Sequence, residues 1–509
     1  MITFIAFFLI CFFSIMSIIE EKESNSRREF IKKSIVGLTA MSVLPSNILS
    51  GMKHSSPGDK LNIAAIGVGG IGFQNLNNLK DENIVALCDV DWDYGQKAFR
   101  RWGSAARYKD YRVMLEKEKN IDAVLIAAPD HIHASAALAA MQLQKHVYVQ
   151  APMAHSVSEV RRLVETGKAY NLVTQVGNQR ASSDYTRDIS EIIWSGAIGE
   201  IREVRAWTTQ PKWKQGVFNL EKRMFAPSAL DWNLFLGQAA EMPYHPRLTP
   251  FGWRAWWNFG NGALGSMGAH ILEPAFRALK LKAPITVEAS SSIYNMDTAP
   301  QSEQIVFMFG KRENLPNLAM PSVKLTWCDG GLMPELVDVV PSGFSVREME
   351  SGLVFFGSEG YIFSDPMAEK FSVVIGGNEV TLSAEKVLYR IPNSSLGHEA
   401  DWVRACKENQ GNRLETSANF ESQAVLTETL LVGSMAVRLQ SLSKKLEWDS
   451  SQMRFTNIDL SDEIEIKGEA DFYVENSMVK FSKARKTYNA ALFVDQCVRP
   501  TSRFGWQQL

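Results

Sequence analysis

The chain has 509 residues, which is enough for two or three domains of ordinary size. Hydrophobic residues make up 45% and charged residues 22%, the balance of a globular protein rather than of a disordered one. Because 54 Lys and Arg residues face 56 Asp and Glu residues, the net charge is −2, and we expect no nucleic-acid partner. The five cysteines are scattered without a CxxC pair, which argues against a disulfide framework, and we expect no metal site.

Residues 1–50 are interpreted as an export signal and not as part of the fold. Residues 1–19 are apolar and uncharged, long enough to span a membrane but without the positive charge of a secretory signal. The run Ser26-Arg-Arg-Glu-Phe-Ile-Lys32 resembles the twin-arginine export signal. A start at Met16 would give this signal an ordinary polar beginning, so residues 1–15 are interpreted as an over-extended start, with a genuine N-terminal anchor as the alternative. The signal predicts a periplasmic or otherwise exported protein that meets the membrane only through this segment.

A glycine-rich loop follows the first predicted strand, residues 61–66, and leads into a helix predicted over 73–80. In such a β-turn-α unit the GxGxxG spacing allows a tight turn, a close approach of a pyrophosphate to the backbone and close packing of helix on strand. A second strand, 84–88, ends in Asp89, 22 residues after the first glycine. The Asp89 carboxylate suits the hydroxyls of the adenosine ribose and would repel a 2′-phosphate, so the pattern predicts NAD rather than NADP. The loop residues expected to contact the cofactor are Gly67, Gly69, Gly70, Ile71 and Gly72.

Strands and helices keep alternating as far as Gln179. Strands are predicted at 122–128, 146–149 and 172–176, and helices at about 134–143 and 156–170, the latter opened by a capping box of Ser156 and Glu159. Alternation of this kind predicts a parallel, doubly wound sheet, in which ligands bind at the carboxyl ends of the strands. The residues at these strand ends that we expect to contact the cofactor are Pro129, His131, His133, Gln150 and Asn178.

The second half of the chain begins with a period-two strand at 200–209 and continues into an aromatic-rich stretch, 231–259. Indole rings suit the apolar C–H faces of sugars, although most of these rings are interpreted as core. An Arg among apolar rings needs an acceptor, which a substrate hydroxyl or carboxylate would provide. The predicted substrate residues are therefore Trp253, Arg254 and Trp257.

Taken together, these motifs resemble the glucose-fructose oxidoreductase, inositol dehydrogenase and rhizopine-catabolism (Gfo/Idh/MocA) family. The resemblance covers about residues 60–460 and the last dozen, and it looks closest to an exported, sugar-active branch of Bacteroides type. Besides the glycine loop, it rests on the runs ALCDVD at 86–91, APDHIH at 128–133, KHVY at 145–148, GNQ at 177–179, DWNLFLG at 231–237, WRAWW at 253–257 and GALG at 262–265.

The resemblance implies an α/β Rossmann domain at 60–180 that binds NAD, followed by an α+β domain at 181–460 with a large, open, mostly antiparallel sheet. Residues 461–509 form a C-terminal tail, in which the basic, mixed stretch 480–495 is interpreted as a surface insertion at an oligomer contact. The implied partners are a small-molecule sugar or glycoside and further copies of the chain, which would associate through the sheet of the second domain.

The resemblance also implies a catalytic role for His270, which lies four residues after Ser266 and on the same face if the stretch is helical. The family His accepts the hydroxyl proton as hydride goes to nicotinamide, and an imidazole with a pKa of roughly 6.5 suits a general base. Two positions depart from the family. Ala151, between Gln150 and Pro152, stands where the family has a hydroxyl-binding Lys, and Ser266 stands where the family has an Asp.

These departures leave three hypotheses open, because each general acid or base is worth roughly 10²–10⁴-fold in rate. The first is an exported NAD-dependent oxidoreductase that acts on a sugar or glycoside through His270. The second is a catalytically impaired NAD-binding relative. The third is a redox-neutral glycosidase or lyase whose NAD is never released. A twin-arginine substrate crosses the membrane folded, and free NAD is scarce outside the cytoplasm, so export favours a retained cofactor. His155 is near the altered strand end in sequence, but its reach is not determined by the sequence.

Overall fold

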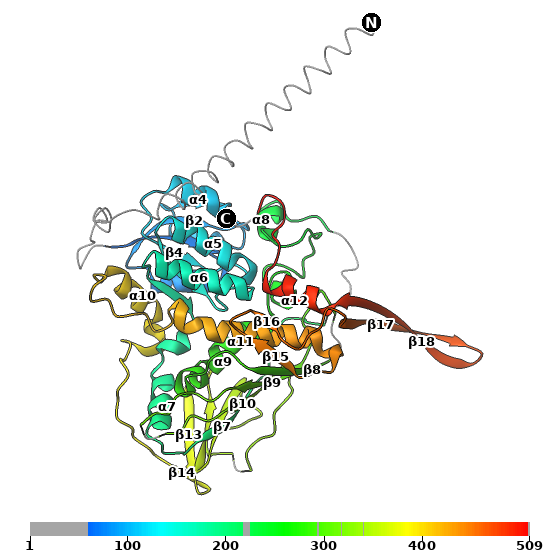
Figure 1. Cartoon of the computed structure of the whole chain (residues 1–509). Coiled ribbons are helices and arrows are strands. Elements are labelled where there is room, and N and C mark those ends of the chain that lie inside the picture. Colours follow the sequence, from blue (N-terminus) through cyan, green and yellow to red (C-terminus); the bar gives the residue numbers. More distant parts are fainter. Residues whose placement is uncertain (1–59, 217–223, 293–294, 317, 339, 507–509) are drawn as a thin grey trace. The chain divides into compact units, whose positions relative to one another are not determined.

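The computed structural model of the protein describes residues 60–216, 224–292, 295–316, 318–338 and 340–506 (Figure 1). The predicted export signal at 1–50 lies outside these residues. Among the helices within them, none is long and apolar enough to cross a lipid bilayer. The described residues form a six-stranded sheet, a ten-stranded sheet and a separate two-stranded hairpin.

The six-stranded sheet is parallel throughout and has the strand order β3-β2-β1-β4-β5-β6. This is the order of doubly wound dinucleotide-binding folds, so the predicted Rossmann domain is confirmed. Its central strands β1 and β4 are apolar and almost wholly buried because helices cover both faces. The elements are β1 (Asn62–Ile66), α2 (Gly70–Asn78), β2 (Asn83–Cys88), α3 (Gln96–Arg101), β3 (Ala106–Tyr108), α4 (Tyr111–Lys117), β4 (Ala123–Ile126), α5 (Asp130–Gln142), β5 (His146–Gln150), α6 (Val157–Ala169) and β6 (Thr174–Gly177).

Two helices of this half begin earlier than predicted, and both shifts matter for the site. Helix α2 starts inside the glycine loop, at Gly70 rather than residue 73. Helix α5 starts at Asp130 rather than residue 134, because Pro129 takes the extended N-cap conformation and an acidic residue suits the first turn. The predicted capping box of α6 is present, with Ser156 and Glu159 hydrogen-bonded reciprocally. Both early starts bring helix N-termini up to the carboxyl ends of β1 and β4.

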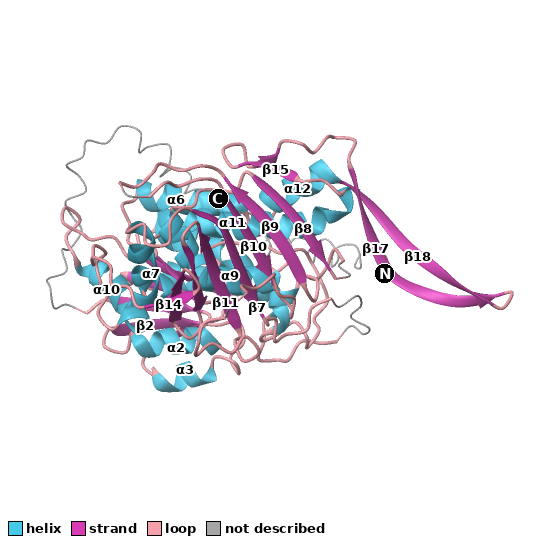
Figure 2. Cartoon of the chain, turned by 90° about the horizontal axis from the view of Figure 1, so that it is seen from below, coloured by secondary structure: helices cyan, strands magenta, loops and turns pink. Residues whose placement is uncertain are grey.

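The second sheet has ten strands in the order β14-β13-β12-β11-β7-β10-β9-β8-β15-β16. Strands β8, β9 and β10 of this sheet are seen in Figure 2. Only the β7–β10 pair is parallel among the described pairs, which confirms the predicted large, mostly antiparallel sheet. Its strands are β7 (Ile201–Thr208), β8 (Thr286–Ser291), β9 (Glu303–Phe309), β10 (Val323–Cys328), β11 (Ser351–Gly357), β12 (Gly360–Asp365), β13 (Lys370–Ile375), β14 (Asn378–Val380), β15 (Leu446–Asp449) and β16 (Arg454–Phe455).

Helices α7 (Asp184–Trp194), α9 (Gly262–Leu279) and α11 (Phe420–Leu439) pack against strands of this sheet, and α11 also contacts α6 of the Rossmann half. Helix α11 packs against α6 of the Rossmann half, against α9 and against strands β8 and β9, so one continuous apolar core links the two sheets. The strands present alternate residues to it, and in β9 the buried apolar residues are Ile305, Phe307 and Phe309. The remaining helices are η3 (Gln179–Ser182), α8 (Trp232–Leu236), η4 (Gly252–Ala255), η5 (Ser394–Gly397), α10 (His398–Lys407) and η6 (Gln440–Leu442).

The C-terminal region forms a long hairpin and a helix. Strands β17 (Glu463–Glu475) and β18 (Met478–Asn489) pair only with each other and extend away from the two sheets (Figures 1 and 2). Helix α12 (Ala490–Val498) follows and buries Phe493, Val494 and Val498 in the core. The expectation of a surface element at 480–495 does not hold for α12, whose apolar face is buried.

A buried pair of carboxyl groups joins two central strands of the second sheet. Glu303 begins β9 and Asp329 follows β10, and their exposed fractions are 3% and 0%. Asp329 accepts hydrogen bonds from the Glu303 backbone N–H (3.0 Å) and from Trp327 Nε1 (3.1 Å). Burial raises the pKa of Asp329 to about 7. Burial, the Asp329 charge and a hydrogen bond to Asp329 raise the pKa of Glu303 well above its ordinary value, so Glu303 holds the proton that the pair shares.

This pair predicts a pH-dependent stability. Because both pKa values are raised on folding, the folded chain binds more protons than the unfolded chain, and the free energy of unfolding falls as pH rises from the ordinary carboxyl range through about 7. We expect Glu303→Gln, which keeps the shape and a donor toward Asp329 but has no proton to lose, to flatten this fall. Urea unfolding at about pH 5 and about pH 8 measures it. The exposed Glu385→Gln serves as the control, and an unchanged pH dependence in Glu303→Gln would refute the shared proton.

Candidate functional site

The carboxyl ends of the parallel strands bring the predicted cofactor residues into one row. Read across the sheet in strand order, β2 ends at Asp89, β1 at the glycine loop, β4 at Pro129, β5 at Gln150 and β6 at Asn178. Neighbouring strands lie about 4.8 Å apart, so the row places a series of groups along one edge at regular spacing. In doubly wound sheets this edge is where the ligand binds.

The glycine loop is closely packed against two strands. Gly67 has φ +76° and donates its N–H to Cys88 O at 2.8 Å, and a Cβ on it would lie 2.6 Å from Ala127 O. A Cβ on Gly72 would lie 2.0 Å from Gly67 O, so neither position tolerates a side chain. The N-terminus of α2 opens directly from this loop, and its free N–H groups and positive dipole end favour an anion. The cradle fits the pyrophosphate of a dinucleotide.

Asp89 lies beside the loop and is held by backbone groups. Its Oδ2 accepts the N–H of Val68 (2.8 Å) and its Oδ1 accepts the N–H of Asp91 (2.9 Å). Burial raises the pKa of Asp89 to about 6, against the lowering effect of these hydrogen bonds. The carboxylate is therefore fixed in direction, ionised at neutral pH and able to accept further hydrogen bonds from a ribose.

A pocket opens at this end of the row, and its two sides come from distant parts of the chain. Among the residues predicted to contact the cofactor, Gly67, Gly69, Ile71, Asp89 and Pro129 line it. The opposite side comes from the second half and the C-terminal segment, namely Leu230, Phe235, Pro250, Trp253, Arg254 and Trp506. The predicted substrate residues Trp253 and Arg254 thus share a pocket with the glycine loop.

Trp506 is a pocket residue that the sequence reasoning missed. The Arg112 guanidinium lies 3.9 Å from the centre of its ring, and Arg503 anchors the segment by donating to Asn233 O (2.9 Å) and Gly237 O (3.0 Å). The run Arg503-Phe-Gly-Trp506 was visible in the sequence. The sequence did not show that this run contacts the edge of the parallel sheet where the cofactor residues lie, because no periodicity or motif connects residues about 400 positions apart.

His131 and His133 do not line this pocket, and their rings contact backbone carbonyl groups. Both are 1% exposed. His131 Nε2 lies 3.0 Å from Phe235 O, and the His133 ring nitrogens lie 2.8 Å from Pro152 O and 2.7 Å from Ala128 O. Burial lowers the pKa of His131 to about 3 and that of His133 to about 4. These neutral rings hold the ends of β4 and β5 in place.

Gln150 and Asn178 are likewise engaged by the protein itself. Gln150 Nε2 donates to Asn75 Oδ1 at 2.8 Å, which links the end of β5 to α2. Asn178 is 0% exposed, and its Nδ2 lies 3.0 Å from Ala269 O, from Glu273 Oε2 and from Gln423 Oε1. Neither amide lines the pocket. Their observed role is to position the strand ends, and Asn178 does so by contacting the residue before His270.

His270 lies on α9, at the β6 end of the row. The helix confirms that Ser266 and His270 share one face, and both side chains are partly exposed. Burial lowers the pKa of His270 to about 4, with smaller contributions from the charges of Arg180 and His398. The imidazole is therefore neutral at pH 7 and able to accept a proton. Ser266 offers a neutral hydroxyl in place of a carboxylate, and the half-buried Ala151 offers no polar group.

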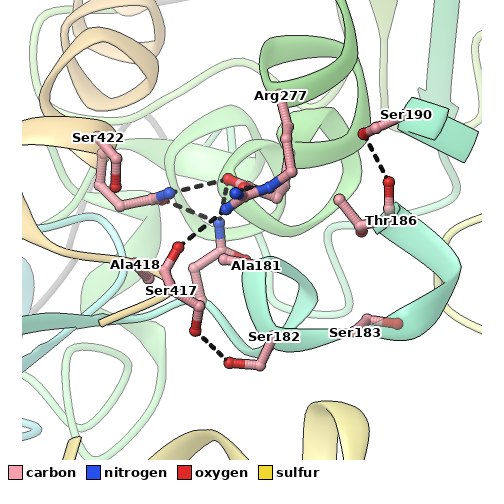
Figure 3. Close-up of polar contacts among 12 residues, drawn as sticks. Ala181, Ser182, Ser183, Thr186, Ser190, Arg277, Ser417, Ala418 and Ser422 are labelled. Atoms are coloured by element: carbon pink, nitrogen blue, oxygen red, sulfur yellow. Dashed lines mark hydrogen bonds and ion pairs between the residues drawn. The ribbon is translucent and has the colours of Figure 1, made fainter. Parts of the chain in front are cut away.

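A buried polar network fixes the far side of α9 (Figure 3). Arg277 pairs with Glu273 (2.8 Å) and donates to Ser417 O (2.8 Å). Ser417 Oγ contacts Ser182 Oγ (2.5 Å), which lies 2.6 Å from His398 Nδ1. Ser182 and His398 have the spacing of a nucleophile and its base, but both are 0% exposed, so they serve the structure rather than hydrolysis.

The structure does not bring Trp257 or His155 to the pocket. Trp257 is buried, with the Arg438 guanidinium 5.2 Å from its ring centre. Burial lowers the pKa of His155 to about 4, and its Nε2 is buried without a hydrogen-bond partner among the described residues. Across the described ranges, no three His, Cys, Asp or Glu side chains are grouped to hold a metal ion.

Comparison with known proteins gives this geometry a context. Residues 61–178 match a family model described as an oxidoreductase family with an NAD-binding Rossmann fold, and residues 184–312 match that family's C-terminal alpha/beta domain. A myo-inositol 2-dehydrogenase of Thermotoga maritima is 27% identical over 154 residues, which cover 30% of this chain and 46% of the relative. An inositol 2-dehydrogenase of Salmonella typhimurium is 26% identical over 197 residues, 37% of this chain and 58% of the relative.

The chain thus spans about half the length of the curated relatives that it matches. The fold also resembles that of an oxidoreductase from Agrobacterium radiobacter, solved in complex with NAD+, L-tartaric acid and magnesium. That structure is 18% identical, has a TM-score of 0.50 and is matched over 78% of this chain and 100% of its own. The chain belongs to the Gfo/Idh/MocA oxidoreductase family, and the cofactor of its Rossmann domain is NAD.

Proposed function

We propose that this protein is an exported NAD-dependent oxidoreductase that acts on a CH–OH carbon of a sugar, cyclic polyol or glycoside, with His270 as the general base. The observation that carries the proposal is the row of strand ends. It leads from Asp89 past the glycine loop and Pro129 to the β6 end, where Asn178 contacts the backbone of the residue before His270. The inositol dehydrogenases among the relatives support a polyhydroxylated substrate.

The described residues around the glycine loop suit the pyrophosphate and the adenosine of the cofactor. The glycine loop and the α2 N-terminus would hold the pyrophosphate, and Asp89 would accept hydrogen bonds from the adenosine ribose. When bound, NAD supplies the hydride acceptor for the substrate carbon. The protein's own contribution to the chemistry is then to orient the substrate and to remove the hydroxyl proton.

His270 is the group that we assign to the proton. Its neutral imidazole can accept the proton of a substrate hydroxyl. Ala151 and Ser266 provide neither the ammonium nor the carboxylate of the wider family. We therefore expect slow turnover, with His270 carrying most of the acid–base catalysis.

A variant of His270 tests this base. We expect His270→Asn to lower kcat for sugar or inositol oxidation by about 10²–10⁴-fold. Because the base must be neutral, activity of the natural protein should stay level down to about pH 5 and fall as pH approaches its pKa of about 4. Absorbance of the reduced nicotinamide during a screen of sugars, inositols and glycosides measures the rates.

A paired variant distinguishes the three hypotheses. Ala151→Lys with Ser266→Asp restores the two missing family groups and should raise kcat above that of the natural protein. Dehydrogenase activity that appears only in this double variant would identify the natural protein as an impaired relative. Product formation from glycosides without a net absorbance change would instead indicate a redox-neutral enzyme.

A further prediction concerns cofactor choice. Asp89 should accept ribose hydroxyls and repel a 2′-phosphate, so NAD should bind more tightly than NADP. Because Asp89→Ala removes charged hydrogen bonds, it should lower the affinity for NAD by about 10- to 100-fold and reduce the preference for NAD over NADP. Because the pKa of Asp89 is about 6, NAD affinity should also fall as pH drops below that value. Calorimetry measures both, the exposed Asp93→Ala is the control, and equal affinities for NAD and NADP would contradict the assignment.

Export is proposed from the twin-arginine run at 26–32. Replacing Arg27 and Arg28 with Lys should abolish the appearance of the mature protein in the periplasm of a host that has the twin-arginine pathway. Fractionation with immunodetection measures this, and Arg202→Lys, far from the signal, is the control. Export that survives the double replacement would favour the alternative of an N-terminal anchor. N-terminal sequencing of the precursor distinguishes a start at Met1 from one at Met16. Association of copies through the ten-stranded sheet remains a prediction.

A further inference from the structure

The β17–β18 hairpin, residues 463–489, is an arm that is anchored at its base. Ile464, near the start of β17, is fully buried, and the Glu465 backbone N–H donates to Ser441 Oγ at 3.0 Å. At the far end, Asn476 and Ser477 have φ of +53° and +61°, the conformation of a two-residue turn that matches the twist of paired strands. Strand β17 has 13 residues, and at roughly 3.4 Å per residue it spans roughly 44 Å, more than the roughly 30 Å diameter of a small domain. The arm is therefore long enough to cross a neighbouring subunit.

The outer end of the arm exposes apolar side chains. Val474, Met478 and Val479 are 66%, 65% and 58% exposed. The register pairs Val474 with Val479 directly across the hairpin, so these apolar residues lie together beside the turn. A two-stranded hairpin alone is marginally stable in water, and exposed apolar residues gathered in one place gain free energy when a partner covers them. The end of the arm is therefore suited to a contact with another surface.

The charges of the arm favour a protein surface over a polyanion or an anionic membrane. Residues 463–489 include five acidic and five basic residues. The five acidic residues lie in β17, and four of the basic residues lie in β18. Nucleic acids and anionic lipids attract segments with a net positive charge, which the arm lacks. Two adjoining strands of opposite charge suit a surface that carries both signs.

The ten-stranded sheet presents a surface of that kind on its outer face, the face turned away from α11. Phe307 of β9 is buried against α11, so its neighbours Val306 and Met308 point outward, where both are half-buried. The register places the exposed Glu288 of β8 opposite Val306, and the exposed Lys324 of β10 opposite Met308. We call the outer side of β8, β9 and β10 the receiving face. It combines apolar side chains with both signs of charge.

The chain itself covers another part of the outer face. Trp207 of β7 and Phe363 of β12 are buried in an apolar cluster to which the segment after β10 contributes, and the Phe344 ring of that segment lies 5.1 Å from the Phe363 ring. Val306 and Met308 belong to none of the apolar clusters that the described residues form. The receiving face is thus the part of the outer face that a second molecule can cover.

We propose that the arm of one copy of the chain lies across the receiving face of a second copy, whose arm returns the contact. Both surfaces belong to one chain, yet the arm extends away from the two sheets (Figures 1 and 2), so a second copy is needed to bring them together. A two-fold axis makes the exchange reciprocal and closes the assembly at two copies. In this contact the apolar end of the arm covers Val306 and Met308, and its charged strands meet Glu288 and Lys324. The association does not depend on the proposed function.

Variants of the two surfaces test this. Sedimentation equilibrium of the purified protein gives the dissociation constant of the dimer. Val474→Asp with Val479→Asp, the arm variant, should raise this constant by about 100-fold or more, because the contact would bury two unpaired carboxylates. Met308→Glu should raise it by about 10- to 100-fold, and the sheet should tolerate the change because Lys324 lies opposite on β10.

Leu396→Asp is the matched control, because it also replaces an exposed apolar residue with a carboxylate but lies in η5, outside both surfaces. It should leave the dissociation constant within about twofold of the natural one. A mixture of the arm variant and Met308→Glu gives a sharper result. The mixed dimer keeps one intact arm on one intact receiving face, so the mixture should associate more tightly than either variant alone.

Other outcomes would overturn the inference. A natural protein that stays monomeric at its highest soluble concentration, or an arm variant that dimerises as tightly as the natural protein, excludes the exchange. Weakening by the arm variant but not by Met308→Glu would overturn the assignment of the receiving face. Monomers that sediment with phosphatidylglycerol vesicles, and lose this binding in the arm variant, would identify a lipid surface as the partner instead. NAD binding and turnover are measured separately, so a failure of the proposed function leaves this test unaffected.

Discussion

The hydrogen bonds of the Asn178 amide hold the two halves of the site in one geometry. Asn178 ends the last parallel strand, and its amide meets both Glu273 on α9 and Gln423 on α11 at 3.0 Å. These three polar side chains are 0%, 2% and 3% exposed. Leaving one such group unpaired costs about 1–3 kcal/mol, and breaking the buried Glu273–Arg277 pair would cost about 3–5 kcal/mol. Because hydrogen bonds are directional, this network sets the position of α9, and with it His270, relative to the strand ends.

The strand end at Gln150-Ala151-Pro152 takes a structural role once the fold is known. Gln150 donates to Asn75 on α2, and the Pro152 carbonyl lies 2.8 Å from His133. The segment that carries a catalytic lysine elsewhere in the family here connects the glycine-loop helix, β4 and β5. Of the three family positions, 151, 266 and 270, only the last holds an ionisable group, and His270 on α9 is neutral at pH 7. A weak base and no ammonium make a slow or redox-neutral enzyme physically reasonable.

The cofactor pocket is assembled from three segments that are remote in sequence. The glycine loop and Asp89 form one side, the stretch around Arg254 forms the other, and Trp506 closes it from the C-terminal segment.

The first half of the fold could be predicted from the sequence because its signals are local. Strand–helix alternation, the Gly67–Gly72 spacing, Asp89 and the Ser156–Glu159 capping box all depend on residues within a few turns of one another, and each is found in the structure. The sheet of the second half came from resemblance alone, since its order pairs β7 with β10 and β11, and β8 with β15, across long separations. Strand pairing of that kind leaves no periodic trace in the chain.

The residues of the candidate site show the same difference between local and long-range signals. The sequence by itself determined which residues stand at the strand ends, that a nucleotide loop is present and that Ala151 and Ser266 lack charge. Only the tertiary structure decided what each side chain contacts: His131, His133, Gln150 and Asn178 turn to protein partners, while Arg254 and Trp506 reach the glycine-loop pocket. The physical reason is that a strand end fixes where a residue lies, whereas the direction of its side chain depends on which donors, acceptors and voids the distant segments bring to it.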